Sequence, residues 1–233
     1  MADPLGKALL KYLNTGEEQK LTVYSNEVHT DEYKASYFFR HLSEMPLQET
    51  KALALCKGNV LDAGAGAGCH SILLQEKGFD VTAIDTSIGA VETMNLRGVS
   101  NAICQSIYDH KGQYDTILMM MNGIGLAGKL KNVSSLLKHL KTLLKPGGQI
   151  LADSSDIYHL YESFDADEFL NLNKDYLGEV EFKFEFEKEF SNWFNWVYLD
   201  HKTFKEQAIQ AGFKYNLIFP VKTSGYLAQL ILD

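Results

Sequence analysis

The residues from Asn59 to Leu74 constrain the fold of this chain more than any other stretch. They read Asn-Val-Leu-Asp-Ala-Gly-Ala-Gly-Ala-Gly-Cys-His-Ser-Ile-Leu-Leu. Val60 and Leu61 form a short apolar run typical of a buried parallel strand, and an apolar helical pattern opens at Ile72. Between them, glycines occupy every second position: Gly64, Gly66 and Gly68. A strand, a glycine loop and a helix in this order bring the backbone close to a ligand at the helix N-terminus.

The spacing of these glycines separates two kinds of nucleotide-binding loop. A dinucleotide fingerprint, Gly-x-Gly-x-x-Gly, needs its third glycine at position 69, where this chain has Cys69. The chain instead reads Asp62-x-Gly64-x-Gly66-x-Gly68. This pattern resembles the first motif of class I S-adenosylmethionine-dependent methyltransferases, Asp/Glu-x-Gly-x-Gly-x-Gly. An NAD-type oxidoreductase and a glycine-rich turn in an unrelated α/β domain are the alternatives.

An acid at the end of the next predicted strand supports the resemblance. Val81 to Asp85 is an apolar run closed by an acid, about 20 residues after the glycine loop, a spacing that suits hydrogen bonds to ribose hydroxyls. The sequence Asp85-Thr86-Ser87 also predicts a helix N-cap. Both roles are compatible, because Ser87 can cap the helix while Asp85 faces the crevice.

Two later segments are also similar to the same family. The apolar run from Tyr114 to Met121 predicts a central fourth strand that ends at Asn122-Gly123. A helix capped by Asn132 and the turn Lys145-Pro146-Gly147-Gly148 lead to a fifth strand, Gln149 to Asp153. The resemblance thus covers Asn59 to Asp153. It implies an α/β fold: a three-layer, Rossmann-like, seven-stranded, mostly parallel sheet with its last strand antiparallel.

We expect a single domain over residues 1–233, with three parts. Residues 1–57 form a helical N-terminal lid, 58–153 the cofactor-binding half, and 154–233 the substrate-side half. The lid would hold helices starting at Pro4, Thr30 and Pro46; a helical layer without ligand contact is the alternative. After the fifth strand, the alternation from Val180 to Phe186 and the run from Trp193 to Leu199 predict an inserted β-hairpin.

The family resemblance implies a site for S-adenosylmethionine. In it, Asp85 would hold the ribose, Arg40 could pair bidentately with the methionine carboxylate, and Ser106 or the backbone of Ile107 would meet the adenine. The family usually has an acid at this adenine position, which this chain lacks. Tyr24 and Tyr33 are further candidates for crevice contacts. The expected cofactor residues are Asp62, Gly64, Ala65, Gly66, Gly68, Asp85, Thr86, Ser106, Ile107, Asn122, Gly123, Tyr37 and Arg40.

The implied reaction is an in-line displacement that transfers a methyl group from the sulfonium. Its main demand is to hold the nucleophile about 3 to 3.5 Å from the methyl carbon. A general base is needed only for a protonated acceptor, and Asp153, Asp156, His159 and His70 are the candidates. The segment after the fourth strand is Asn122-Gly123-Ile124-Gly125. It lacks the Asn/Asp-Pro-Pro-Tyr motif of enzymes that methylate bases or glutamine side chains.

The net charge and the composition limit the kinds of molecule that this protein is expected to bind. The net charge is −8, and no basic cluster is visible that could neutralise phosphates, so we expect no nucleic-acid substrate. We also expect no membrane span, no signal peptide and, from the spacing of the three cysteines, no metal site. A cytoplasmic methyltransferase with a small-molecule acceptor fits best, and the hairpin is a candidate homodimer surface. A non-catalytic module that binds an adenosyl ligand is the alternative.

Overall fold

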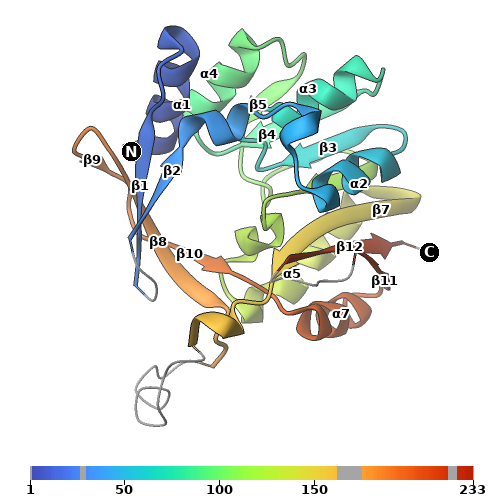
Figure 1. The fold of residues 1–233 in the computed structure, drawn as a ribbon. Coiled ribbons are helices and arrows are strands. Elements are labelled where there is room, and N and C mark those ends of the chain that lie inside the picture. The colour runs from blue at the N-terminus through green and yellow to red at the C-terminus, as the bar shows by residue number, and fades with distance from the viewer. Residues whose placement is uncertain (1, 27–29, 162–174, 220–224, 233) are drawn as a thin grey trace.

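The computed structural model describes residues 2–26, 30–161, 175–219 and 225–232. Its main sheet has seven strands in the order β11-β12-β7-β6-β3-β4-β5 (Figure 1). β12 runs antiparallel to both of its neighbours, and the five strands from β7 to β5 are parallel. The predicted sheet and its antiparallel last strand are therefore confirmed. The strands are β3 (Val60–Ala63), β4 (Val81–Asp85), β5 (Ala102–Cys104), β6 (Tyr114–Met119), β7 (Leu144–Ser155), β11 (Lys214–Phe219) and β12 (Gly225–Ile231).

Helices cover both faces of this sheet and bury its alternating apolar side chains. On one face, Leu118 and Leu151 pack in a cluster with residues of α2 and α3, while α4 packs on Ala83. On the other face, Ile117 and Ile150 pack in a larger cluster with α5 and α7. These helices are α2 (Leu47–Leu55), α3 (Cys69–Glu76), α4 (Ile88–Leu96), α5 (Leu130–Thr142) and α7 (His201–Gln210).

A second, smaller sheet stands beside the strand ends of the first. Its order is β10-β8-β1-β2, with the short β9 paired to β8, and it curves away from the main sheet (Figure 1). β8 and β10 pair antiparallel, with Phe182 opposite Phe194, so the predicted hairpin is confirmed. The strands are β1 (Lys20–Ser25), β2 (Asp31–Lys34), β8 (Glu179–Phe186), β9 (Glu189–Phe190) and β10 (Phe194–Val197).

The N-terminal segment is not wholly helical, and this part of our expectation was wrong. The predicted helices at Pro4 and Pro46 are present as α1 (Pro4–Thr15) and α2. The region from Lys20 to Lys34 forms β1 and β2 instead, followed by the short 3₁₀ turns η1 (Ala35–Phe39) and η2 (Leu42–Glu44). β1 pairs with β8 as well as with β2, so a partner far away in sequence decides its conformation.

One carboxylate fixes α1 against the main domain. Asp3 accepts a hydrogen bond from the Gly6 amide at 2.9 Å and thereby caps α1. The same carboxylate bonds the Ser87 hydroxyl and, at 2.9 Å, the Gly89 amide at the start of α4. The two helices meet at Gly6 and Gly89, where a Cβ on Gly89 would come within 2.6 Å of the Gly6 backbone.

Two short 3₁₀ turns and the start of α5 are the remaining features of the fold. η3 (Gly123–Ala127) follows β6, and η4 (Tyr158–Tyr161) follows β7. Asn132 does not cap α5 as expected: the helix begins at Leu130, and the Asn132 side chain donates to the Ala127 carbonyl. Within the described residues, no helix has the length and apolar character needed to span a bilayer.

Candidate functional site

A cavity of about 1480 Å³ lies between the two sheets. The glycine loop and the ends of β4, β6 and β7 line it from the main sheet. Residues 32–40, β8 and β10 line it from the other side. Its wall thus combines the predicted cofactor half with parts of both the N-terminal segment and the hairpin.

The glycine loop turns at the floor of this cavity. Gly64 and Gly66 line it and have φ of 77° and 56°, a left-handed conformation that glycine adopts without steric cost. The Gly64 and Ala65 amides bond the Ile84 carbonyl, which ties the loop to β4. Gly68 does not line the cavity: a Cβ there would lie 2.9 Å from Val99. This third glycine therefore allows close packing of α3 on the chain around α4 and lies outside the described cavity wall.

Asp85 stands at the end of β4 and lines the cavity. Its Oδ2 accepts from the Gly66 amide and its Oδ1 from the Ser87 amide, each at 2.9 Å. A carboxylate has about four lone-pair sites, so each oxygen retains the capacity to accept a ligand hydroxyl. Burial raises the pKa of Asp85, although the backbone bonds oppose that shift.

The chain after β5 forms one end of the cavity. Ser106 and Ile107 line it, as predicted, and Thr86 lies on the same side. His139 of α5 bonds the Ile107 carbonyl at 2.8 Å and so fixes this segment from behind. The predicted adenine-binding residues therefore sit together on a supported loop.

The end of β6 is the most strained part of the wall. Met121 and Asn122 have φ of 62° and 59°, which costs energy for residues that carry a side chain. Asp153 of β7 stabilises this turn, because its Oδ1 accepts the Asn122 amide at 2.8 Å. Burial raises the pKa of Asp153 to about 7, against the opposing effect of the Asn122 and Gly123 amides. Asn122, Gly123 and Asp153 all line the cavity.

Arg40 is already paired within the protein. Its guanidinium forms a bidentate contact with Glu49 of α2, Nη1 to Oε1 at 3.0 Å and Nη2 to Oε2 at 3.1 Å, and its Nε donates to the Tyr37 carbonyl. We expected this bidentate geometry toward a methionine carboxylate; the structure gives it to Glu49. Arg40 still lines the cavity, with only 7% of its surface exposed.

Glu49 also holds His70, the second residue of α3. His70 Nε2 lies 2.6 Å from Glu49 Oε2. Burial lowers the pKa of His70, but Cys69, Glu49 and Asp62 together outweigh that effect and raise it well above 6.5. Burial raises the pKa of Glu49, but the contacts with His70 and Arg40 outweigh that effect and lower it, so the contact favours a charged pair.

Asp62, the first residue of the motif, lies at the base of the loop. Its side chain is 2% exposed, and its Oδ2 accepts from the Ser71 hydroxyl of α3 at 2.6 Å. Burial raises its pKa, opposed by His70 and Ser71. Asp62 thus joins β3 to α3, while still reaching the cavity wall.

Two of the three tyrosine candidates line the cavity, and the third does not. Tyr33 and Tyr37 line the cavity, and the Arg40 guanidinium lies 3.9 Å from the Tyr37 ring centroid. Tyr24 is not part of the cavity wall; its hydroxyl donates to Glu185 at 2.5 Å.

Two of the candidate bases are outside the cavity. Asp156 and His159 are exposed residues at η4 and are not part of its wall. Asp156 caps that turn by accepting the Tyr158 amide at 2.9 Å. The chain turns away from the crevice after Ser155, so Asp153 and His70 are the predicted bases that reach the cavity.

Residues 162–174, part of the segment expected to cover the crevice, lie outside the described residues.

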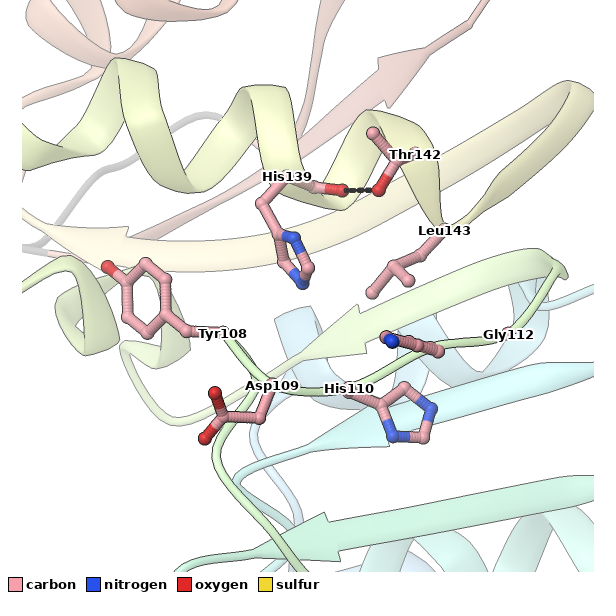
Figure 2. Close-up of a pocket in the computed structure, with 8 residues that line it drawn as sticks. Tyr108, Asp109, His110, Gly112, His139, Thr142 and Leu143 are labelled. Atoms are coloured by element: carbon pink, nitrogen blue, oxygen red, sulfur yellow. Dashed lines mark hydrogen bonds between the residues drawn. The ribbon is translucent and has the colours of Figure 1, made fainter.

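A second pocket, of about 620 Å³, lies on the outside of the loop after β5. Figure 2 shows its wall, formed by Tyr108 to Gly112 and the end of α5. Its two histidines make internal contacts: His139 bonds Ile107, and His110 lies 2.8 Å from the Tyr114 hydroxyl. We therefore assign this pocket a supporting role for the loop. Among the residues described, no three His, Cys, Asp or Glu side chains are grouped as a metal site would require.

The sequence analysis missed several residues of the cavity wall. Glu49, Cys69 and Gln105 line it, and so does Asp3. Cys69 was considered only as an interruption of the dinucleotide pattern, although a first-turn residue of the helix after the loop is expected near a ligand. Nothing local identified Glu49, because its partners come from other elements. Among the described residues of the wall, acids outnumber bases: the acids are Asp3, Glu32, Glu44, Glu49, Asp62, Asp85 and Asp153, and the bases are Lys34, Arg40 and His70.

Comparisons with known proteins agree with this geometry. A family model described as a methyltransferase domain matches residues 31–216. A solved S-adenosylmethionine-dependent methyltransferase from Bacteroides fragilis, in complex with S-adenosyl-L-homocysteine, is 39% identical. That match covers 99% of this chain and 95% of the other, with a TM-score of 0.90.

Two curated relatives match a part of the chain. YqeM of Bacillus subtilis, which is named as a methyltransferase, is 28% identical over 126 residues, 51% of each chain. A cypemycin N-terminal methyltransferase from a Streptomyces species is 28% identical over 102 residues, 42% of each. The chain thus spans about half the length of these curated relatives.

The residues fit the cofactor of this family. Left-handed glycines bring the backbone to the cavity, Asp85 offers free acceptor positions, and Ser106 and Ile107 close the far end. The glycine loop follows β3 of the seven-stranded sheet, as the sequence predicts. The chain belongs to the S-adenosylmethionine-dependent methyltransferases of class I.

Proposed function

We propose that the protein methylates a small-molecule acceptor held between its two sheets. The observation that carries this proposal is the single cavity of about 1480 Å³, which unites the cofactor loop with the second sheet. Such a volume exceeds the upper range of about 1,000 Å³ for common ligand pockets, so it has room for a cofactor and an acceptor together. The family assignment favours methyl transfer over the oxidoreductase and the non-catalytic binding module.

In this proposal the cofactor supplies an electrophilic methyl group on a sulfonium. Asp85 accepts the ribose hydroxyls, Ser106 and Ile107 contact the adenine, and the Gly64–Gly66 backbone meets the methionine part. Arg40, His70 and Glu49 act as one charged group beside the glycine loop. The second sheet encloses the acceptor and excludes water from the transfer. The free thiols of Cys56, Cys69 and Cys104 support a reduced, cytoplasmic setting.

Binding and transfer test the proposal separately. We expect S-adenosylhomocysteine to bind the purified protein in calorimetry, NAD not to bind, and labelled methyl to pass from S-adenosylmethionine to a compound in a metabolite extract of small molecules. Asp85→Ala removes two acceptor positions, each worth about 0.5–1.5 kcal/mol, and should weaken binding of S-adenosylhomocysteine roughly 5- to 100-fold. Asp80→Ala is the matched control, because this exposed acid precedes the same strand at its opposite end. Equal affinity of both variants would refute the role of Asp85.

A further inference from the structure

We propose that the methyl acceptor is an amine that carries a flat or apolar ring. The proposal rests on the proposed function and adds the chemical class of the substrate. Two features of the cavity carry it: an aromatic wall on the second sheet, and an excess of acids over bases among the described residues that line the cavity.

The aromatic wall consists of alternate residues of β8 and β10 together with Tyr198. These side chains are in contact: the ring centroids of Phe184 and Phe194 are 5.0 Å apart, and those of Phe194 and Trp196 are 6.4 Å apart. They are only half-buried although they lie on the inner face of the sheet, so part of each ring faces the cavity. The wall residues are Phe182, Phe184, Phe194, Trp196 and Tyr198.

The wall adjoins the β6 end, where transfer is positioned in our proposal. The Trp196 indole packs on Gly125 so closely that a Cβ there would lie 2.1 Å from Nε1. Gly125 is in η3, the turn that Asn122 begins. A ring stacked on the wall therefore lies near Asn122 and Asp153. Such a ring gains the apolar and quadrupole contacts that aromatic surfaces offer.

The charged residues of the cavity wall favour one kind of functional group on the acceptor ring. Among the described residues of the wall there are three bases, and two of them, Arg40 and His70, are paired with Glu49. The third, Lys34, is an exposed residue at the end of β2. An acceptor with a carboxylate or phosphate would thus find no free buried cation among the described wall residues. An amine suits this site, because its cationic form is attracted both to Asp153 and to aromatic faces.

The bound ammonium first gives one proton to the Asp153 carboxylate, which leaves a neutral amine. The nitrogen lone pair then forms a bond to the methyl carbon while the carbon–sulfur bond breaks and leaves its electron pair on sulfur. The methylated nitrogen is again cationic, and it leaves the site in that form or releases one proton to water. Asp153 therefore has two functions here, as the cap of the strained β6 turn and as the polar end of the acceptor site.

Fragments that share one ring test the acceptor class without catalysis. Protein saturated with S-adenosylhomocysteine is titrated with phenethylamine, 2-phenylethanol, 3-phenylpropanoate and the ringless butylamine. We expect phenethylamine to bind at least 10-fold more tightly than the carboxylate and than butylamine. Carboxylate binding equal to or tighter than that of the amine, or no binding of the amine, would overturn the proposal.

Two variants locate the site on the aromatic wall. Trp196→Phe should weaken phenethylamine binding at least 3-fold, with circular dichroism confirming the fold. Trp193→Phe is the matched control, because Trp193 is not part of the cavity wall. Its side chain is 48% exposed, and its ring centroid lies 5.1 Å from Lys183 Nζ. Equal losses in both variants would place the fragment elsewhere and contradict the proposal.

The reaction product separates this inference from the proposed function. The protein is incubated with ¹³C-methyl S-adenosylmethionine and a metabolite extract, and the position of the label is read by NMR. A methyl group on nitrogen of a ring-bearing amine supports the proposal. Label on oxygen, carbon or sulfur overturns the acceptor class but leaves methyl transfer intact. Failure to bind S-adenosylhomocysteine would instead refute the proposed function itself.

Discussion

At the residue scale, Asp153 links the acceptor site to stability through its proton. Burial raises its pKa to about 7, whereas an unfolded aspartate has a pKa of about 3.9. The folded protein therefore holds this proton between those two values, where the unfolded chain has lost it. The resulting stabilisation is complete below the unfolded pKa and is lost as the pH rises through 7.

Asp153→Asn should remove this pH dependence. We expect the variant to gain about 1–4 kcal/mol relative to wild type between pH 4 and pH 8, because the amide cannot ionise. Urea unfolding of both proteins at the two pH values measures this difference. A constant offset between the two proteins across this range would show that Asp153 ionises normally.

Glu49 is the second residue whose role can be isolated. It is 3% exposed and binds both Arg40 and His70. Glu49→Gln leaves two buried cations with a neutral partner, and we expect a loss of about 3–5 kcal/mol in the free energy of unfolding. Glu92→Gln, an exposed change on α4, is the control and should stay within about 0.5 kcal/mol. A similar small effect of both changes would show that the triad adds nothing.

At the scale of elements, Asp3 joins α1 to α4, because it caps α1 and also accepts the Gly89 amide in the first turn of α4, whose N-cap is Ser87. Asp3→Ala removes the bonds to Gly6 and Gly89 together, and each helix cap is worth about 0.5–2 kcal/mol. We therefore expect a total loss of about 1–4 kcal/mol. Asp156→Ala, which removes the cap at the start of a short exposed turn, should cost less than half of that. Thermal unfolding compares the two variants, and equal shifts would contradict the double role of Asp3.

At the scale of the whole molecule, the cavity depends on both sheets. Deleting the residues before Pro46 would remove β1 and β2 and expose the edge of β8, which invites aggregation. Hydrogen exchange in the intact protein is therefore the cleaner test of the N-terminal segment. We expect S-adenosylhomocysteine to slow exchange at residues 36–38 and at Arg40, which line the cavity, but not at β11 on the far edge of the main sheet. Protection at Gly64 to Gly68 alone would make this segment a structural layer.

The parts of the fold that could be predicted from the sequence are those with local signals. The glycine loop, Asp85 and the central strands follow from spacing and from apolar runs. β1 has a signal as well, since Leu21 and Val23 alternate with polar residues, but one of its two partners, β8, lies far along the chain. The Arg40–Glu49 pair could not be found in this way, because it joins a 3₁₀ turn to a helix at a spacing that no single element would bring together. Asp156 lies outside the cavity wall because the chain bends away from the crevice after β7 ends.

The position of β1 in the second sheet also has a consequence for biosynthesis. The hydroxyl of Tyr24 and the carboxylate of Glu185, which meet across the β1–β8 pair, are 161 residues apart. β1 therefore leaves the ribosome well before β8 exists, and the aromatic wall is among the last parts to form. At synthesis rates of about 5–20 residues per second, this strand waits about 8–32 s with a pairing edge open. During synthesis, the glycine loop of the cofactor site therefore leaves the ribosome before the aromatic wall of the proposed acceptor site.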